Sequence, residues 1–232
     1  MIHLLGMTIH EPDVVFTDLA LALLGAYFGW RLWTGRQGWL ARAGSILMIG
    51  LASAAFWGAI FHAFFPEDTA TTPGFMAWIP VALSILLAAT AMLHIALRIL
   101  VPGLPRGIGH ILLAGYAAAF AGVVLLIDES FSSIVRFYVP ALLLFLVGAG
   151  WQAIRRGSGW SLIVAGLVVS AGAALLQQAQ VALDPYLDHN AVYHVLQSIA
   201  LVFLYRGFRA VPQGGGTAYA IGANSASREG RA

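Results

Sequence analysis

The sequence predicts an all-α integral membrane protein, a bundle of seven transmembrane helices. Of its 232 residues, 60% are hydrophobic and only 9% are charged. Its apolar runs repeatedly reach the roughly 20 residues that a helix needs to cross a bilayer. Transmembrane strands would alternate apolar and polar residues over roughly 10 positions, and runs such as "LIVAGLVVSAGAALL" do not alternate. Helices are therefore the predicted spanning elements.

Each predicted helix is an apolar run that follows a short connection containing Pro, Gly, Ser or charged residues. In chain order these connections are "HEPD", "GRQGWLARAG", "EDTATTPG", "VPGLPRG", "DESFSS", "RRGSG" and "LDPYLDH". The predicted helices cover residues 13–33, 45–65, 74–100, 110–127, 134–154, 160–182 and 190–208. Pro80 predicts a tilt or kink in the third, because proline frees a backbone carbonyl one turn earlier. Gly25 and Gly29 form a GxxxG pattern in the first, which favours close helix packing.

The chain is predicted to form one domain, residues 1–209, followed by a tail, residues 210–232. The tail, "AVPQGGGTAYAIGANSASREGRA", is rich in Gly, Ala and Ser and has no hydrophobic periodicity, so we expect disorder there. The N-terminal "MIHLLGMTIHEPD" lacks the basic segment and the cleavage site of a signal peptide. We therefore expect the first helix to direct insertion.

Arginine positions predict the orientation, because loops retained in the cytoplasm carry the excess of positive charge. Arginines flank alternate loops, at positions 31, 36, 42, 98, 106, 155, 156, 206 and 209. Acidic residues occupy the other side, at positions 11, 13, 67, 68, 128, 129, 184 and 188. The N-terminus is thus predicted outside and the C-terminus in the cytoplasm. Arg136 breaks the pattern, and we expect it to pair with Asp128 or Glu129, or to bind an anionic headgroup.

Two missing residue types limit the function. The chain has no cysteine, so it has no disulfide, no thiolate nucleophile and no cysteine-based metal site. All twelve basic residues are arginine, and without a lysine amine the chain cannot form a retinal Schiff base. The arginines of the predicted cytoplasmic loops explain the excess of basic residues in the sequence. No nucleic-acid partner is therefore expected.

Four ionisable residues share one predicted depth, about one turn below the outer surface. Asp18 lies in the first helix, His62 near the outer end of the second, and His189 and His194 at the start of the seventh. Ionisable side chains in a membrane are costly and usually face the bundle interior or a wet cavity. We therefore take these four residues as candidates for a functional site.

Polar amides are expected around this site. Asn190, His194 and Gln197 are spaced by four and three residues, which places them on one helical face. Gln177 lies near the outer end of the sixth helix. The simplest arrangement is a polar pocket that opens to the outside, with Asn190, Gln197 and Gln177 supporting the ionisable groups.

Three imidazoles and a carboxylate at one depth are the ligands that a zinc site would use. Neutral histidine nitrogens bind the ion, and an open fourth position lets it lower the pKa of a bound water to about 7. A nearby carboxylate would fix a histidine tautomer or accept the proton of the water. The alternative is a structural polar network, in which Asp18 bonds a helix or Tyr193. His94 and His110, near the inner surface, are expected to hydrogen-bond neighbouring helices.

The segments "AIFH" and "HNAVYH", on the second and seventh of seven helices, resemble the CREST superfamily of membrane hydrolases. Within that superfamily the alkaline ceramidases are most similar, with a Ser-x-x-Phe-His motif, a His-x-x-Trp-His motif and a Glu-Pro segment like "HEPDVVFTD". The resemblance implies that His62, His189 and His194 bind zinc and that a zinc-activated water attacks an amide.

The sequence also departs from this family. Gly58 stands where the family has serine, and His189 and His194 are five residues apart, with Asn190 at the four-residue spacing. The family has an aspartate early in its third helix, and Asp68 is the nearest match to it in this sequence.

On the hydrolase interpretation, Asp18 or Asp68 is the general base and Tyr193 polarises the substrate carbonyl. The substrate would be a membrane lipid that enters from the outer leaflet, with an amide or an ester bond.

Two alternatives belong to other functional classes. A haem-binding electron-transfer protein would pair His62 with His194 and His94 with His110. A receptor, chaperone or transporter without chemistry would use Asp18 and Arg136 as gating or relay charges. The arginine-rich, lysine-free and alanine-rich composition suggests a GC-rich bacterium and thus the inner, cytoplasmic membrane. The oligomeric state is left open.

Overall fold

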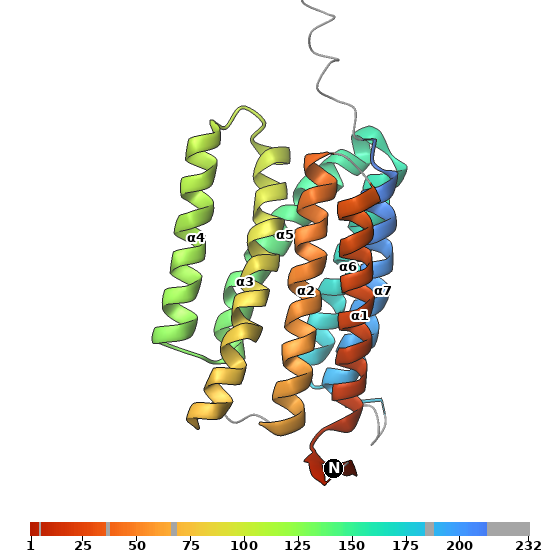
Figure 1. Cartoon of the computed structure of the whole chain (residues 1–232). Helices are drawn as coiled ribbons and strands as arrows, with labels where there is room; N and C mark the ends of the chain where they lie inside the picture. Colours follow the sequence, from red (N-terminus) through yellow and green to blue (C-terminus); the bar gives the residue numbers. More distant parts are fainter. Residues whose placement is uncertain (5, 36–37, 66–68, 184–187, 213–232) are drawn as a thin grey trace, which may run out of the picture.

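The computed structural model describes residues 1–4, 6–35, 38–65, 69–183 and 188–212, and it confirms the prediction of a seven-helix bundle (Figure 1). The helices are α1 (Pro12–Gly35), α2 (Trp39–Phe64), α3 (Thr72–Leu100), α4 (Arg106–Leu126), α5 (Phe131–Arg156), α6 (Ser158–Gln178) and α7 (His189–Ala210). All seven are long and apolar enough to cross a membrane. Of the predicted tail, residues 213–232 lie outside the described part of the chain.

A small hairpin that the sequence analysis did not predict precedes the bundle. β1 (Ile2–Leu4) and β2 (Met7–Ile9) pair antiparallel, and Gly6 in the turn has φ +80°. The backbone N–H of His10 donates to the carbonyl of Ala63 at 3.0 Å, so the hairpin lies against the end of α2. Strands of three residues are too short to show an alternating pattern, which is why the all-α prediction missed them.

α6 ends at Gln178, so the predicted end at residue 182 was wrong. Gln180 adopts a left-handed conformation with φ 54°, and the N–H of Val181 donates to the carbonyl of Leu176 at 3.0 Å. Helices commonly end in this way, with a residue in the left-handed conformation just after the last helical turn. That residue is usually glycine. Because glutamine occupies that position here, no glycine marked this end of the helix for prediction.

Six helices form a closed ring in the order α1, α2, α3, α5, α6, α7 and back to α1. α4 lies outside the ring and packs against α3 and α5, as its position at the edge of the bundle in Figure 1 shows. The first and last transmembrane helices are therefore neighbours, although most of the chain separates them. This neighbourhood brings residues of α1 and α7 into contact.

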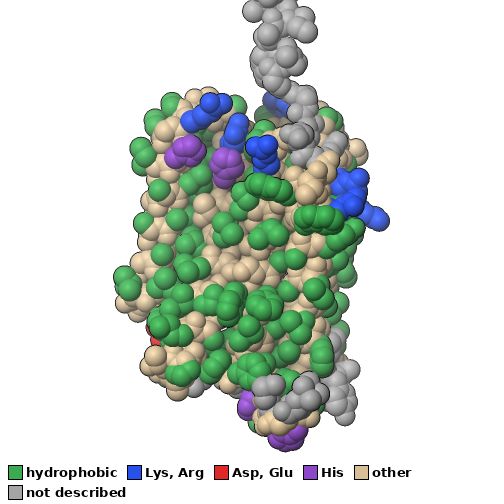
Figure 2. All heavy atoms as spheres, viewed as in Figure 1, with side chains coloured by type: hydrophobic (Ala, Val, Ile, Leu, Met, Phe, Trp, Pro, Cys, Tyr) green, Lys and Arg blue, Asp and Glu red, His purple; other side chains and the backbone are tan. Residues whose placement is uncertain are grey.

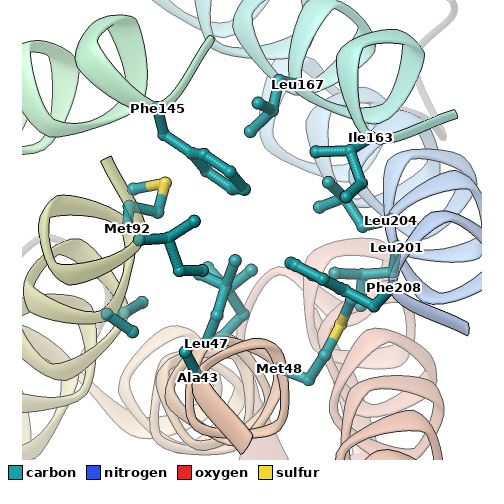
Figure 3. Packing of buried hydrophobic residues seen from close by; sticks show 14 of the residues in the cluster. Ala43, Leu47, Met48, Met92, Phe145, Ile163, Leu167, Leu201, Leu204 and Phe208 are labelled. Atoms are coloured by element: carbon teal, nitrogen blue, oxygen red, sulfur yellow. The ribbon is translucent and has the colours of Figure 1, made fainter. Parts of the chain in front are cut away.

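Buried hydrophobic side chains fill one half of the ring (Figure 3). Met48 of α2, Met92 of α3, Phe145 of α5 and Phe208 of α7 point towards one another and are essentially inaccessible. Met48 lies in the first half of α2 and Phe208 near the end of α7, so the filled half is the one remote from the hairpin. Between transmembrane helices such packing stabilises the bundle through dispersion contacts.

Charge divides the two ends of the bundle. Arginine side chains gather at the end opposite the hairpin, which we call the arginine end, whereas histidine side chains are present at both ends (Figure 2). We call the other end the hairpin end. All carboxylate side chains of the described residues lie in that half of the bundle. They are Glu11, Asp13, Asp18, Asp128, Glu129 and Asp188.

Arg136 is paired as predicted. Its Nη1 lies 3.8 Å from Oδ2 of Asp128 at the hairpin end. Asp128 also accepts hydrogen bonds from the hydroxyl of Ser133 and from the N–H of Ser130. These hydrogen bonds, with the charge of Arg136 adding to them, lower the pKa of Asp128 to about 2. The carboxylate is therefore ionised at neutral pH.

Small residues set the helix spacing on both faces of α2. A Cβ on Gly25 would lie 3.0 Å from Cβ of Ala52, and one on Gly29 would lie 2.7 Å from the side chain of Ile49. The GxxxG pattern thus packs α1 closely on α2, as expected. On the opposite side, a Cβ on Gly50 would meet the backbone of α3, 2.9 Å from the nitrogen of Ala88.

Replacing Gly50 by valine should push α2 away from α3, because the obstacle is backbone that cannot rotate aside. We expect Gly50→Val to destabilise the protein by about 1–3 kcal/mol, the usual range for overpacking. Gly115→Val is the matched control, since a Cβ at Gly115 of α4 meets nothing within 4 Å. Thermal unfolding in detergent measures both variants, and equal losses of thermal stability would contradict the close approach.

Candidate functional site

A cavity of about 380 Å³ occupies the hairpin half of the bundle. Helices α1, α2, α3, α5, α6 and α7 all contribute to its lining. Its apolar walls include Leu21, Leu51, Phe61, Trp78, Val81 and Ile134. Its polar lining includes eight of the predicted site residues: Asp18, His62, Gln177, His189, Asn190, Tyr193, His194 and Gln197. The structure therefore brings residues from four helices to one cavity, while Asp68 lies outside the described residues.

Asp18 of α1 and His194 of α7 form a buried polar contact at the wall of the cavity. Nε2 of His194 lies 3.1 Å from Oδ1 of Asp18. Both residues are buried, with exposed fractions of 1% for Asp18 and 7% for His194. Two ionisable groups are costly to bury unless they satisfy each other, so this contact requires that α1 and α7 keep their alignment.

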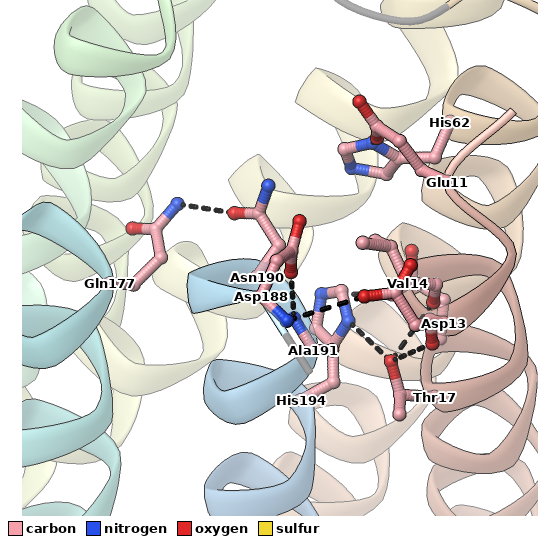
Figure 4. Close-up of polar contacts among 11 residues, drawn as sticks. Glu11, Asp13, Val14, Thr17, His62, Gln177, Asp188, Asn190, Ala191 and His194 are labelled. Atoms are coloured by element: carbon pink, nitrogen blue, oxygen red, sulfur yellow. Dashed lines mark hydrogen bonds and ion pairs between the residues drawn. The ribbon is translucent and has the colours of Figure 1, made fainter. Parts of the chain in front are cut away.

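Loop and cap interactions at the hairpin end hold that alignment. Oδ1 of Asp188 accepts a hydrogen bond from the N–H of Ala191 at 2.8 Å and so caps the start of α7. The N–H of Asp188 in turn donates to Oδ2 of Asp13, in the first turn of α1, at 3.3 Å (Figure 4). The starts of the two helices are thus connected directly. From these starts, Asp18 and His194 each lie about five residues along their helix.

Thr17 contacts the other nitrogen of the same imidazole. Its Oγ1 lies 3.2 Å from Nδ1 of His194. It also lies within hydrogen-bonding distance of two α1 carbonyls, 2.9 Å from that of Asp13 and 3.0 Å from that of Val14 (Figure 4). A hydroxyl has a single hydrogen, and when Thr17 donates it to a carbonyl it can only accept from Nδ1–H. The hydroxyl thereby orients the ring.

The proton count of the Asp18/His194 pair depends on the tautomer of the imidazole. With Nδ1 carrying a hydrogen that Thr17 accepts, the contact between Nε2 and Oδ1 requires one more proton, on either the imidazole or the carboxyl group. With Thr17 donating to Nδ1 instead, Nε2 carries the hydrogen and donates it to Oδ1. In both tautomers one proton lies between the two side chains. The geometry is unlike a nucleophilic triad, because Thr17 does not line the cavity and its hydroxyl is bonded to its own helix.

The second oxygen of the Asp18 carboxylate has no partner. Oδ2 is buried and accepts no hydrogen bond from any described residue. Gly58 of α2 makes room for it, since a Cβ at this position would lie 2.9 Å from Oδ2. The glycine that departs from the ceramidase pattern is therefore the residue that lets a carboxylate from α1 reach the cavity.

Gln197, one turn below His194 on α7, presents an unpaired donor. The hydroxyl of Ser170 on α6 donates to Oε1 of Gln197 at 2.7 Å, which orients the amide. The Nε2 group of Gln197 is buried and has no acceptor among the described residues. An unpaired buried donor costs about 1–3 kcal/mol unless something bonds it. Among the described residues that line the cavity, the buried polar atoms without a partner are thus an acceptor, Oδ2 of Asp18, and two donors, Nε2 of Gln197 and Nε1 of Trp78.

Two of the amides that were expected around the site bond each other at the mouth of the cavity. Nε2 of Gln177 on α6 donates to Oδ1 of Asn190 on α7 at 3.1 Å (Figure 4). Tyr193 also lines the cavity, and its ring centroid lies 5.3 Å from that of His194. Asp18 bonds His194 rather than Tyr193, so the proposed alternative of an Asp18 to Tyr193 bond is absent from the described contacts.

Glu11 is a site residue that the sequence analysis missed. Its Oε2 lies 2.6 Å from Nδ1 of His62, near the cavity mouth (Figure 4). The sequence placed Glu11 only among the charges that precede the first helix. Thr17 was missed as well, and its position beside Asp18 was the only signal available. Both residues make contacts with distant helices, which local spacing does not reveal.

The predicted zinc ligands do not converge. The described residues contain no group of three His, Asp or Glu side chains placed to hold a metal ion. Both ring nitrogens of His194 have protein partners, and Nδ1 of His62 is bonded to Glu11. His189 lines the cavity but does not form, with the other two imidazoles, a group that could hold a metal ion. The arrangement therefore does not fit a three-histidine zinc site, and zinc binding stays a prediction.

The role of Thr17 is tested by Thr17→Val, which keeps the shape of the side chain and removes its hydroxyl. We expect the free energy of unfolding to fall by about 1–3 kcal/mol, because the buried Nδ1–H of His194 then has no acceptor. Thr34→Val is the control: Thr34 makes the same kind of bond within α1, to the carbonyl of Trp30 at 2.9 Å, but contacts no histidine. Equal thermal stability of the two variants would show that Thr17 does not hold the ring.

Comparison with known proteins gives a family but no function. No curated protein and no solved structure matches the chain. One family model, described as a family of unknown function (DUF6962), matches residues 14–213. This range covers all seven helices except the first two residues of α1. The chain therefore belongs to the DUF6962 family of unknown function.

Proposed function

We propose that this protein is a membrane-embedded hydrolase that cleaves an amide or ester bond of a lipid. The observation that carries the proposal is the buried Asp18/His194 pair at the wall of the cavity, with one carboxylate oxygen unpaired. A buried carboxylate that shares a proton with an imidazole is suited to move protons during hydrolysis. Ionisable groups inside a membrane bundle mark functional sites by default, because they are costly to keep there.

The shape of the cavity supports a lipid substrate. Its walls are mainly apolar, so an acyl chain can lie against them while the polar part of the lipid meets Asp18 and Gln197. The packed core around Phe145 and Phe208 fills the arginine half, so the site is approached from the hairpin end. With the arginine end in the cytoplasm, as the charge distribution favours, the substrate enters from the outer leaflet. Composition favours a bacterial inner membrane.

The proposed reaction uses residues of this chain alone. Gln197 Nε2 donates to the carbonyl oxygen of the substrate, and this bond strengthens as negative charge develops on that oxygen. Asp18 Oδ2 takes a proton from water while the water oxygen forms a bond to the carbonyl carbon. The same proton then passes to the leaving nitrogen or oxygen as the bond from carbon breaks. His194, oriented by Thr17, balances the charge of Asp18 while the carboxylate is ionised.

The products are a carboxylic acid and an amine or an alcohol, so one water is consumed for each bond cleaved. Tyr193, predicted to polarise the carbonyl, lines the same cavity and can share this role with Gln197.

The other interpretations receive less support from the geometry. Haem ligation needs a free imidazole nitrogen, and both nitrogens of His194 have partners. A relay across the membrane needs polar groups in both halves, whereas a hydrophobic cluster occupies the arginine half. Zinc-dependent hydrolysis remains a second version of the proposal, since His62, His189 and His194 line one cavity.

Asp18→Asn tests the acid–base role, because asparagine keeps the shape but does not accept a proton. We expect hydrolysis to fall by a factor of about 10²–10⁴, the usual contribution of general acid–base catalysis. The assay incubates detergent-purified protein with matched N-acyl amide and O-acyl ester lipids and measures the released fatty acid by mass spectrometry. Asp128→Asn is the control: it makes the same chemical change at the same end of the bundle, outside the cavity. Undiminished hydrolysis by Asp18→Asn would refute the mechanism.

Metal content distinguishes the two versions of the proposal. The mechanism above predicts that activity survives a strong chelator and that purified protein carries no stoichiometric zinc. Elemental analysis compares the wild type with His62→Ala and His194→Ala. About one zinc per chain, lost in both variants together with activity, would contradict the metal-free mechanism and support a zinc hydrolase in which the imidazoles rearrange.

A further inference from the structure

A second hollow lies at the arginine end, on the outer surface of the bundle. It is a groove of about 430 Å³ between α2 and α3. Its lining consists of Gly38, Trp39, Arg42, Ala43, Ile46 and His94. Trp39, Arg42, Ala43 and Ile46 follow the three- and four-residue spacing of one helical face, and His94 faces them from α3. The groove is remote from the cavity that holds Asp18.

The groove carries positive charge that nothing in the described structure neutralises. Arg42 is exposed and has no acidic partner, and every described carboxylate lies in the hairpin half of the bundle. Arg98 lies over the ring of Trp39, 4.6 Å from its centroid, and adds a second guanidinium beside the groove. The start of α2 also has no side-chain cap at Gly38, so the positive end of its dipole faces the same region.

Trp39 is held in place from two sides. The guanidinium of Arg98 covers the indole ring, and the ring of His94 meets it edge-on with the centroids 6.3 Å apart. A fixed tryptophan at the end of a transmembrane helix is typical of the layer of lipid headgroups. The groove therefore lies at the depth where phosphates of the bilayer are found.

The groove also has an apolar part. Ile46, one turn farther along α2 than Arg42, lines it and is exposed by 39%. It lies towards the centre of the membrane from Arg42, since α2 begins at the arginine end. A ligand with an anionic head and a long hydrocarbon chain matches this sequence of basic and apolar side chains, whereas free phosphate would use only the basic part.

We propose that this groove binds the phosphate of an anionic phospholipid, with Arg42 and His94 as its donors and Ile46 along the acyl chain. Basic pockets between transmembrane helices on the cytoplasmic side bind anionic headgroups in this way. The site is separate from the proposed hydrolase cavity and does not depend on it.

The test measures lipid retained by the full-length protein. Protein purified in detergent is mixed with phosphatidylglycerol or phosphatidylcholine of the same acyl chains, separated from free micelles, and analysed by mass spectrometry for lipid per chain. We expect preferential retention of phosphatidylglycerol and a loss of about fivefold or more in Arg42→Gln, since one arginine near a lipid phosphate contributes about 1 kcal/mol.

Arg155→Gln is the control, because Arg155 lies at the same end and over another tryptophan, 4.1 Å from the ring centroid of Trp151, but outside the groove. It should retain lipid like the wild type. The proposal is overturned if Arg42→Gln retains as much phosphatidylglycerol as the wild type, if both variants lose it equally, or if phosphatidylcholine is retained equally well. Displacement of the lipid by millimolar inorganic phosphate would also overturn it, by showing a site for the free anion.

Discussion

The contact between the Asp18 carboxylate and the His194 imidazole is the interaction on which the hairpin half of this bundle depends. It joins the first and last transmembrane helices, and neither group could be buried there alone without a large loss of solvation energy. The supporting contacts follow from it: Thr17 orients the imidazole, Asp13 and Asp188 align the helix starts, and Gly58 leaves space for the carboxylate. A single buried proton thus organises residues of α1, α2 and α7.

The two halves of the bundle differ in how their interiors are filled. At the arginine half, large hydrophobic side chains and close helix contacts fill the ring, and this packing supplies stability. The hairpin half also has smaller hydrophobic clusters, but it contains the cavity, where a buried donor on Gln197 and a buried acceptor on Asp18 have no partners among the described residues. Unsatisfied polar groups of this kind are costly, and they persist in proteins mainly where a ligand or a reaction uses them.

The sequence predicted the parts of this structure that depend on local composition. Seven helices follow from apolar runs, and the shared depth of Asp18, His62 and His194 follows from counting residues along those runs. Depth does not determine partners. Three histidines at one level suggested convergence on a metal, yet Glu11 bonds His62 while Asp18 and Thr17 bond His194. Which side chains meet depends on helix rotation and ring order, and on neighbours such as Gly58, whose missing side chain matters only once α1 lies against it.

A double-mutant cycle across Asp18→Asn and His194→Gln tests the central claim most directly. If the two residues act as one unit, each single variant should already abolish most of the hydrolysis, and the double variant should be scarcely slower than either. Their effects on the free energy of unfolding should likewise be non-additive, with a coupling energy of about 0.5–3 kcal/mol. Additive losses in both measurements would mean that Asp18 and His194 act independently, and would contradict the account.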